Sequence, residues 1–441
     1  MAESLVRRIR DHVAGIDIGS EDIFISVPGH PVVQFRTLTP YLQEAVAFLQ
    51  SQGVTSVAME ATGVYWVAFY EMLEQAGFEI CVANARDVKH LPGRKSDVAD
   101  CQWIAEMHAH GLLRSSFIPP ENIRQLRSYV RQRDRLIEES AHQVLLMQKA
   151  LDLMNVRLHT VISQLTGVSG MRVLRAILSG EHKARRLLAL CETSIRKNKE
   201  REVLASLKGN YRPEHVFALR QAIETWDFLQ KQIAECEAEI SAHLTAMTHD
   251  LPPPEIPSEE KPSRHHQPDI DDLHGKLTRL SEGKNPASIT GMSDTTFLRL
   301  TAEVGVKLDA WKSGKHFVSW CTLAPAKHQS GKKGMKRIRQ NKNARVGQIF
   351  RQMAMSIACS KHNALSSFYR RIAARRGKPV AIKAVARKLA MMFYDVMTKG
   401  VHFVEQGIAR YEEQYRERYV AYLSKQAKNF GLTVVKLESV H

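Results

Sequence analysis

The hydrophobic pattern of this chain changes its period near residue 118, so the residues before and after that point require different architectures. Before it, short apolar runs alternate with helix-like segments in the order β-β-β-α-β-α-β-α, which is typical of an α/β layer. The pattern predicts strands at 13–18, 23–27, 32–37, 54–59 and 78–83, and helices at 41–50, 65–75 and 97–111. We therefore expect an α/β domain over residues 1–118.

Residues 119–250 carry a heptad pattern instead. From Ile123 onward, alternating steps of three and four residues reach Leu165, and eleven of those thirteen positions are apolar. A second seam runs from Leu219 to Met247. Seams of this kind predict paired helices, and hence a coiled-coil or helical domain. They do not identify the partner, so a helix pair within one chain and an arm that also joins protomers stay equally open.

The remaining residues are distinguished by composition and charge. Residues 251–275 are proline-rich and predict a linker, 276–410 a basic, mainly helical domain, and 411–441 a charged tail. The net charge is +17, and the 85 positions between Asp309 and Asp395 hold 20 lysines and arginines but no acidic residue. A solvated helix face normally mixes both signs, so this stretch predicts contacts with a nucleic-acid backbone. The candidate contacts are Lys327, Lys332, Lys333, Lys336, Arg337, Arg339, Lys342 and Arg345.

The composition disfavours several other classes of protein. The six cysteines are scattered without a Cys-x-x-Cys pair, which argues against a zinc ribbon or a disulfide framework and for a reducing compartment. No apolar run approaches the ~20 residues of a membrane-spanning helix, and the N-terminus lacks the apolar core of a signal peptide. We expect a cytoplasmic, nucleoid-associated bacterial or archaeal protein without a membrane partner.

Four carboxylates fall where the α/β order would bring them together. Asp17 and Glu60 stand at the ends of predicted strands, and Asp97 and Asp100 share one face of a predicted helix. Like charges in one pocket repel unless cations neutralise them, and Mg²⁺ prefers such hard oxygen ligands. The four residues are therefore candidate catalytic residues that bind Mg²⁺. Taken singly, the two on the helix could be a cap and a surface residue.

A second candidate catalytic residue lies in the stretch between Asp309 and Asp395, called here the acid-free stretch because it has no acidic residue. Ser330 precedes Gly331 in a loop flanked by lysines, where a hydroxyl can approach a phosphate and the positive field would stabilise a phosphorane. No carboxylate is near in sequence to act as a base, so a catalytic Ser330 needs activation from a distant group. From the residues alone, a serine that only hydrogen-bonds a phosphate is the simpler interpretation.

These motifs together resemble the DEDD transposases of the insertion sequence 110 family and their Piv-type DNA invertase relatives. The matching segments are Gly-Ile-Asp-Ile-Gly at 15–19, Met-Glu-Ala-Thr-Gly-Val-Tyr at 59–65, Asn-Ala-Arg-Asp-Val-Lys followed by Lys-Ser-Asp-Val-Ala-Asp within 84–100, and Leu-Ala-Pro-(x)₄-Ser-Gly-(x)₂-Gly at 323–334. One departure is the insert at about 166–275, which makes the spacer longer than the simplest family pattern.

The resemblance implies a RuvC-like (RNase H-type) N-terminal domain, an α-helical coiled-coil middle and a mainly α-helical C-terminal transposase domain. It implies Mg²⁺ at Asp17, Glu60, Asp97 and Asp100, and a covalent phosphoserine link between Ser330 and DNA. It also implies a structured bridge RNA as a guide. The family further implies a homo-oligomer, dimer to tetramer, in which the acidic domain of one protomer meets the serine domain of another.

We therefore expect a transposase, a site-specific DNA recombinase that cleaves and rejoins DNA through Ser330 with the help of the acidic site. The main alternative is a metal-dependent, structure-selective nuclease with water as its nucleophile. The segment Gly-Ile-Asp-Ile-Gly also suggests an actin-like ATPase or sugar kinase, but the chain lacks their further phosphate-binding glycine loops. A non-catalytic coiled-coil protein that binds nucleic acid is the fourth possibility.

Overall fold

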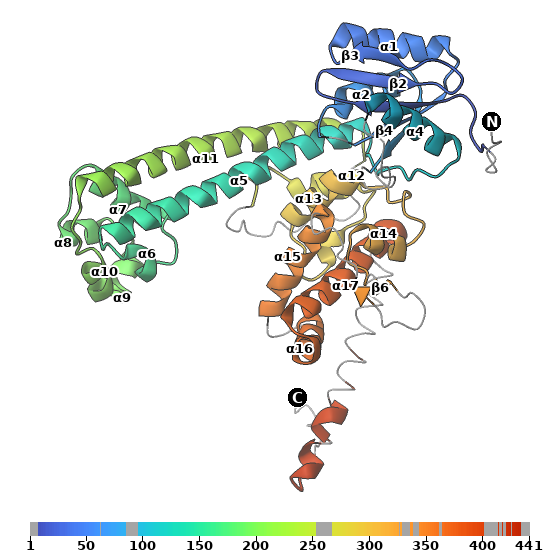
Figure 1. Cartoon of the computed structure of the whole chain (residues 1–441). Coiled ribbons are helices and arrows are strands. Elements are labelled where there is room, and N and C mark those ends of the chain that lie inside the picture. Colours follow the sequence, from blue (N-terminus) through green and yellow to red (C-terminus); the bar gives the residue numbers. More distant parts are fainter. Residues whose placement is uncertain are drawn as a thin grey trace. The chain divides into compact units, whose positions relative to one another are not determined.

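A computed structural model of the chain describes residues 8–61, 63–84, 96–252, 267–325, 344–360 and 364–400, the backbone of 327–328 and 336–337, and parts of 413–433. The chain divides into two compact units, Met1–Ile118 and Pro119–His441 (Figure 1). Along the described residues, no helix combines the length and the apolar character that a membrane crossing requires.

The N-terminal unit is a five-stranded sheet with three described helices. Its strands are β1 (Val13–Ile18), β2 (Asp22–Ser26), β3 (Val33–Arg36), β4 (Ser56–Glu60) and β5 (Glu79–Ala83), and its helices are α1 (Thr39–Ser51), α2 (Trp66–Gln75) and α4 (Asp97–Ala109). The strand order is β3-β2-β1-β4-β5, antiparallel from β1 to β3 and parallel from β1 to β5. This RNase H-like sheet, followed by a mainly helical remainder, confirms the predicted fold class.

The two faces of this sheet bury side chains of different size. Alternate residues of β1 and β4, among them Ile16 and Met59, belong to a large apolar core that includes Leu49 of α1 and Phe69 of α2. On the opposite face Gly15 and Ala58 lie side by side in register, and α4 covers them. Small residues on this face allow the helix to approach the strands closely.

Gly15 is the closest point of that approach. A Cβ atom at Gly15 would lie only 2.2 Å from the backbone nitrogen of Ala105 and 2.3 Å from the carbonyl oxygen of Cys101. Any other residue would therefore push α4 away from the sheet. Because Gly15 and Asp17 are two residues apart on one strand, they point to the same face. The helix thus crosses the sheet on the side where Asp17 points.

In the second unit the two heptad seams pair with one another within the chain. Helices α5 (Glu121–Leu153) and α11 (Pro213–Thr248) lie side by side along most of their length (Figure 1). The two polar positions of the first seam have polar partners on α11. Arg133 forms a buried ion pair with Glu237 at 2.7 Å, and Gln230 Nε2 donates to Ser140 Oγ at 2.9 Å.

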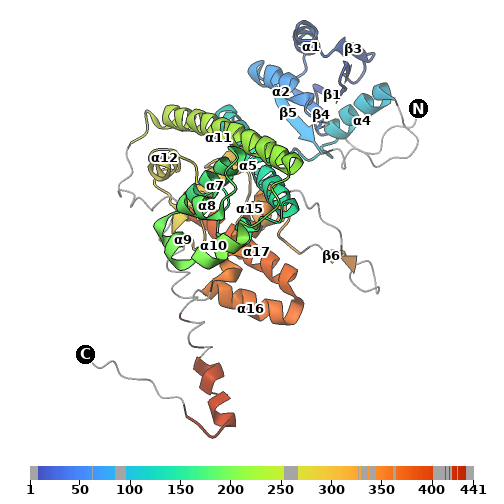
Figure 2. The same cartoon turned by 90° about the vertical axis from the view of Figure 1, so that its left-hand side faces the viewer.

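The first seam ends earlier than expected, so the prediction of a continuous seam to Leu165 was wrong. Asn155 adopts a left-handed conformation with φ 55°, and the chain then folds into a lobe of short helices at the end of the helix pair (Figure 2). The helices are α6 (Leu158–Val161), α7 (Val168–Leu178), α8 (Ala184–Ala189), α9 (Thr193–Asn198) and α10 (Glu200–Ser206). Leu158 and Leu165 are buried in the core of this lobe, which explains their place in the apolar pattern.

The C-terminal part of this unit is mainly helical, with one short hairpin. Its elements are α12 (Leu273–Leu280), the 3₁₀ helix η1 (Pro286–Ser288), α13 (Asp294–Val304), α14 (Gly314–Trp320), α15 (Arg345–Cys359), α16 (Ala364–Arg376) and α17 (Lys378–Lys399), and the strands β6 (Lys327–His328) and β7 (Lys336–Arg337). The ring of Phe317 packs against Trp311, Phe350 and Phe393, with centroids 5.1–6.3 Å apart. Helix α12 begins inside the segment that the sequence predicted to be a linker, because Asp272 caps it by accepting from the Gly275 backbone N–H.

Candidate active site

The sheet register places Asp17 and Glu60 on neighbouring strands at the same edge of the sheet. Strands β1 and β4 are parallel with Ile16 opposite Met59, so the next residues along them are Asp17 and Glu60. Residues in register share a face, and here it is the face that α4 covers. Glu60 is buried, and Asp17 is half-buried.

The N-terminus of α4 carries the other two carboxylates. Ser96 caps this helix, since its hydroxyl accepts from the Ala99 backbone N–H at 3.2 Å. Asp97 and Asp100 occupy the first turn, where the helix dipole favours negative charge. Because Ser96 is the cap, the carboxylate of Asp97 is not required for capping, and its side chain is exposed in the first turn.

The four carboxylates lie within electrostatic reach of one another. The pKa of Asp17 is raised to about 6, first by burial and then by the negative charges of Asp97, Asp100 and Glu60. Asp97 and Asp100 belong to α4 and Glu60 to β4, so two other elements place negative charge near Asp17 at the end of β1. The structure thus brings together the four acidic residues that the sequence singled out.

The donor chemistry of this group fits a divalent cation. Within the described ranges, no three carboxylate, histidine or cysteine side chains already converge closely enough to enclose a metal ion. The four carboxylates form an open set of hard oxygen donors whose mutual repulsion a cation would relieve. Oxygen donors of this kind suit Mg²⁺ or a similar hard ion.

The neighbouring titratable groups are structural. The ring Nε2 of His108 lies 2.8 Å from the hydroxyl of Ser56, and burial lowers the pKa of His108. Burial raises the pKa of the Cys101 thiol to about 12, so this side chain stays protonated and is a poor metal ligand at neutral pH. This packing gives His108 a structural role.

The serine and most of its basic neighbours lie outside the described residues. These are Ser330, Lys332, Lys333, Arg339 and Lys342. Lys327, Lys336 and Arg337 belong to the β6–β7 hairpin, in which Lys327 is opposite Arg337. Of the predicted phosphate contacts, only Arg345, the first residue of α15, has a described side chain.

Two segments of the chain match known transposase families. Residues 14–156, which include all four carboxylates, match the profile of the DEDD transposase domain of IS110 elements. Residues 285–370, which include Ser330, match the transposase IS116/IS110/IS902 family. The chain belongs to the IS110 family of transposases. It is therefore an enzyme of DNA transposition, which binds DNA and acts on it by transesterification, and its DEDD domain implies a divalent metal. A search among curated proteins gave no match.

In this transposase, arginines from three helices pair with two carboxylates outside the predicted site, the buried Glu303 and the half-buried Asp134. Arg131 of α5 donates to both carboxylate oxygens of Glu303 at 2.8 and 2.7 Å, and Arg345 Nε lies 3.6 Å from Glu303. Asp134 lies 3.0 Å from Arg299 Nε and 3.6 Å from Arg345 Nη2. Arg345, expected to contact phosphate, is thus held by α5 and α13 at the point where the serine-containing segment joins α15.

Sequence reasoning missed Asp134 and Glu303. Each stands on a helix among other charged residues, as a solvated side chain would, and no spacing links residues 134 and 303. In the structure their side chains are only 12% and 8% exposed. Their role follows from the packing of α5 against α13, which the sequence pattern does not contain.

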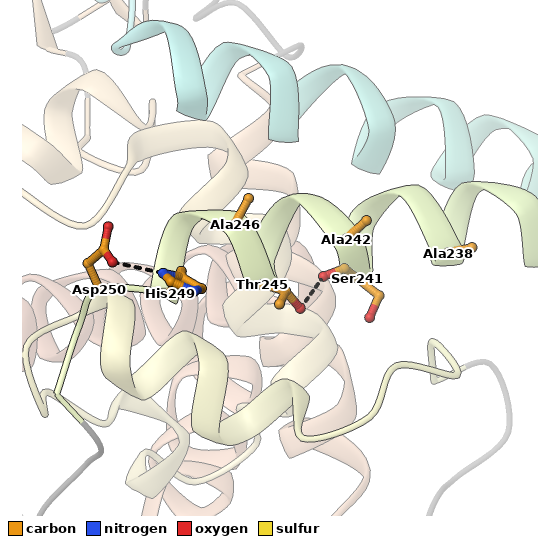
Figure 3. Close-up of a pocket in the computed structure, with 7 residues that line it drawn as sticks. All are labelled: Ala238, Ser241, Ala242, Thr245, Ala246, His249 and Asp250. Atoms are coloured by element: carbon orange, nitrogen blue, oxygen red, sulfur yellow. Dashed lines mark hydrogen bonds and ion pairs between the residues drawn. The ribbon is translucent and has the colours of Figure 1, made fainter.

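A hollow on the C-terminal half of α11 offers no comparable chemistry (Figure 3). It is lined by Ala238, Ser241, Ala242, Thr245, Ala246, His249 and Asp250. Thr245 Oγ1 donates to the backbone oxygen of Ser241, and His249 Nδ1 lies 2.8 Å from Asp250 Oδ1. With one carboxylate in its lining, this hollow does not provide the ligand set that the acidic group provides.

Proposed function

We propose that this transposase is a site-specific DNA recombinase that cleaves and rejoins DNA through Ser330, with Mg²⁺ held by Asp17, Glu60, Asp97 and Asp100. The observation that carries the acidic half of the proposal is the parallel register of β1 and β4, which sets Asp17 and Glu60 on neighbouring strands on the face that α4 covers. Asp97 and Asp100 stand in the first turn of that helix. Burial, and then the charges of these three neighbours, raise the pKa of Asp17 to about 6. The serine half is supported by the placement of Ser330 in the family-matched region and in a stretch without acidic residues.

The four acidic residues would hold the divalent cation, because carboxylates alone repel an anionic phosphodiester. Asp17 and Glu60 are fixed by the sheet, and Asp97 and Asp100 by a capped helix, so the four donors have limited freedom. When bound, the divalent cation supplies charge neutralisation at the phosphate and at the leaving oxygen. The rigid placement of the carboxylates lowers the entropic cost of positioning the reacting phosphate.

The serine step conserves the energy of the phosphodiester bond. The Oγ atom of Ser330 attacks the phosphorus, its proton leaves to a base or to water, and one phosphorus–oxygen bond of the DNA backbone breaks to release a DNA hydroxyl. Rejoining is the reverse: a DNA hydroxyl attacks the phosphoserine, and Ser330 leaves and regains a proton. The surrounding lysines stabilise the extra negative charge of the pentavalent intermediate.

A guide RNA and an oligomer complete the proposal. Both come from the family resemblance, which implies a bridge RNA and a homo-oligomer, dimer to tetramer. An oligomer would let the acidic domain of one protomer and the serine of another act on the same phosphate. We therefore propose RNA as a partner alongside the element ends and the target DNA.

Covalent attachment to DNA is the direct test. Purified transposase is incubated with Mg²⁺, its flanking noncoding RNA and labelled DNA with the element ends, and adducts are separated on a denaturing gel. We expect adducts with the wild type and with Ser288→Ala, an exposed serine of the same unit. Ser330→Ala should form none, and Asp17→Ala should reduce them strongly.

The outcomes separate the proposal from its main alternative. Adducts that persist in Ser330→Ala would exclude Ser330 as the nucleophile. Strand cleavage without any adduct, in both the wild type and Ser330→Ala, would establish a nuclease that uses water. Undiminished adducts in Asp17→Ala would exclude the acidic group from the reaction.

A further inference from the structure

The lobe at the end of the helix pair, residues 154–212, is strongly basic. It holds twelve lysines and arginines against four acidic residues, although the chain outside this lobe and the acid-free stretch carries more acidic than basic residues. All twelve cations are exposed. Eight of them are arginines, whose planar guanidinium matches the geometry of a phosphate.

Most of this charge is not neutralised by the protein. Four of the cations form ion pairs, and three of their partners (Asp152, Asp227 and Glu214) belong to α5 and α11 rather than to the lobe. Within the described part of the chain, no ion pair involves the other eight. They are Arg172, Lys183, Arg185, Arg196, Lys197, Lys199, Arg201 and Lys208. A surface used only for solubility would pair more of its cations with acids.

Two hollows in the lobe combine these cations with groups that suit a nucleotide. The first, of 720 Å³, lies between α7 and the segment 189–196, and its polar lining residues are Arg172, Glu192, Thr193, Ser194 and Arg196. Its two guanidinium groups and two hydroxyl groups are all hydrogen-bond donors suited to phosphate oxygens.

The second hollow adds aromatic rings to a cation. It is lined by Lys208, Asn155, Asn210, and the rings of His182 and Tyr211. The two rings are stacked at 4.3 Å with an angle of 12° between their planes. An aromatic platform beside a lysine is typical of surfaces that bind the bases and the backbone of a nucleic acid together.

The lobe is also rigid enough to present these groups. Its helices share a buried core that includes Leu174, Ile177, Leu187 and Val203 and continues into the ends of α5 and α11. A preformed surface loses little conformational entropy on binding. The cations therefore stand on a folded platform and not on a flexible tail.

We propose that residues 154–212 form a second nucleic-acid-binding module, separate from the basic stretch 310–394, which grips the sugar-phosphate backbone through Arg172, Arg196 and Lys197. The proposal extends beyond the recombinase function and does not depend on the role of Ser330. The shared chemistry is a polyphosphate backbone with bases, and the experiment distinguishes whether RNA or DNA supplies it.

The test measures binding by the full-length protein in EDTA, so that the acidic site does not contribute. The probes are a labelled RNA hairpin and a labelled DNA duplex, both of mixed sequence and equal length. The test variant is Arg172→Gln/Arg196→Gln/Lys197→Gln. The matched control is Lys149→Gln/Arg220→Gln/Lys231→Gln, which removes three exposed cations from α5 and α11. Equal thermal unfolding of all three proteins establishes that the fold is retained.

We expect the test variant to bind at least one probe about 10- to 100-fold more weakly near 0.1 M salt, and its salt dependence to fall by about 2–3 in slope on duplex DNA. A loss confined to the hairpin assigns the lobe to RNA, and a loss confined to the duplex assigns it to DNA. Equal affinities and slopes for the test variant and the wild type, or an equal loss in the control, would overturn the proposal. This assay measures neither strand cleavage nor adduct formation, so failure of the lobe and failure of the serine mechanism are distinguishable.

Discussion

Replacing Asp17 by asparagine should stabilise the metal-free protein while abolishing its activity. In the folded protein the pKa of Asp17 is about 6, compared with an ordinary value of 3.8, because burial and three neighbouring carboxylates disfavour its charge. Two pKa units correspond to about 3 kcal/mol. Water still reaches part of this side chain, and screening reduces the expected gain to about 1–2 kcal/mol.

The pH dependence of this gain has a defined sign. At pH 7.5 the carboxyl is ionised in both the folded and the unfolded chain, so the folded state carries the full cost of the charge. Below pH 3.8 it is protonated in both states, and the cost is absent. The folded state thus holds a proton that the unfolded state has lost between pH 3.8 and about 6. The advantage of Asp17→Asn should therefore shrink as the pH falls from about 6 toward 4.

Urea unfolding in EDTA measures this difference directly. The control is Asp11→Asn, an exposed aspartate of the same unit, which should leave the unfolding free energy within about 0.5 kcal/mol of the wild type. Added Mg²⁺ should raise the stability of the wild type more than that of Asp17→Asn. A gain that is absent at pH 7.5, or that is the same at pH 5 and pH 7.5, would refute the electrostatic coupling among the four carboxylates.

Two further changes test the packing that positions these groups. Gly15→Ala should destabilise the N-terminal unit by about 1–3 kcal/mol and impair DNA cleavage, because a Cβ atom 2.2 Å from the Ala105 nitrogen displaces α4. Urea unfolding and cleavage rates that match those of the wild type would contradict the close packing of α4 on β1. Glu237→Leu should cost about 3–5 kcal/mol in unfolding free energy, because it removes the carboxylate that forms the buried ion pair with Arg133. The double variant Arg133→Leu/Glu237→Leu should recover most of that loss, and a double variant as unstable as the single one would show that the ion pair is not the cause.

Most of the N-terminal fold could be predicted from the sequence, because the hydrophobic pattern of each segment agrees with the way that the segment packs in the structure. The strand predicted at 13–18 is β1, and the helix predicted at 97–111 is α4 with its end at Ala109. The seam beyond Leu153 failed for a physical reason. Apolar side chains at helical spacing are buried equally well by a long helix pair and by a compact lobe, and the left-handed turn at Asn155 decides between them.

The four clustered carboxylates could be predicted from the sequence, whereas the packing that positions them could not. Carboxylates at strand ends have few structural uses, so Asp17 and Glu60 stood out in the sequence. The closeness of α4 to the sheet depends on Gly15, whose role becomes visible only through its distance to Ala105. The Arg133–Glu237 pair was hidden for a similar reason, since Arg133 appeared only as an interruption of an apolar seam.

The ion pairs that Asp134 and Glu303 form with Arg345 affect how much positive charge the acid-free stretch keeps for binding DNA. Twenty cations without a single acid in 85 residues would repel one another in a compact fold. The chain relieves this repulsion at Arg345 with two carboxylates from α5 and α13, outside the stretch. Acids placed within the stretch would instead neutralise its charge along its whole length and weaken its attraction for DNA. Compensation at Arg345 therefore fixes the start of α15 without adding acidic residues to the stretch, whose positive charge supports the phosphate contacts that we propose.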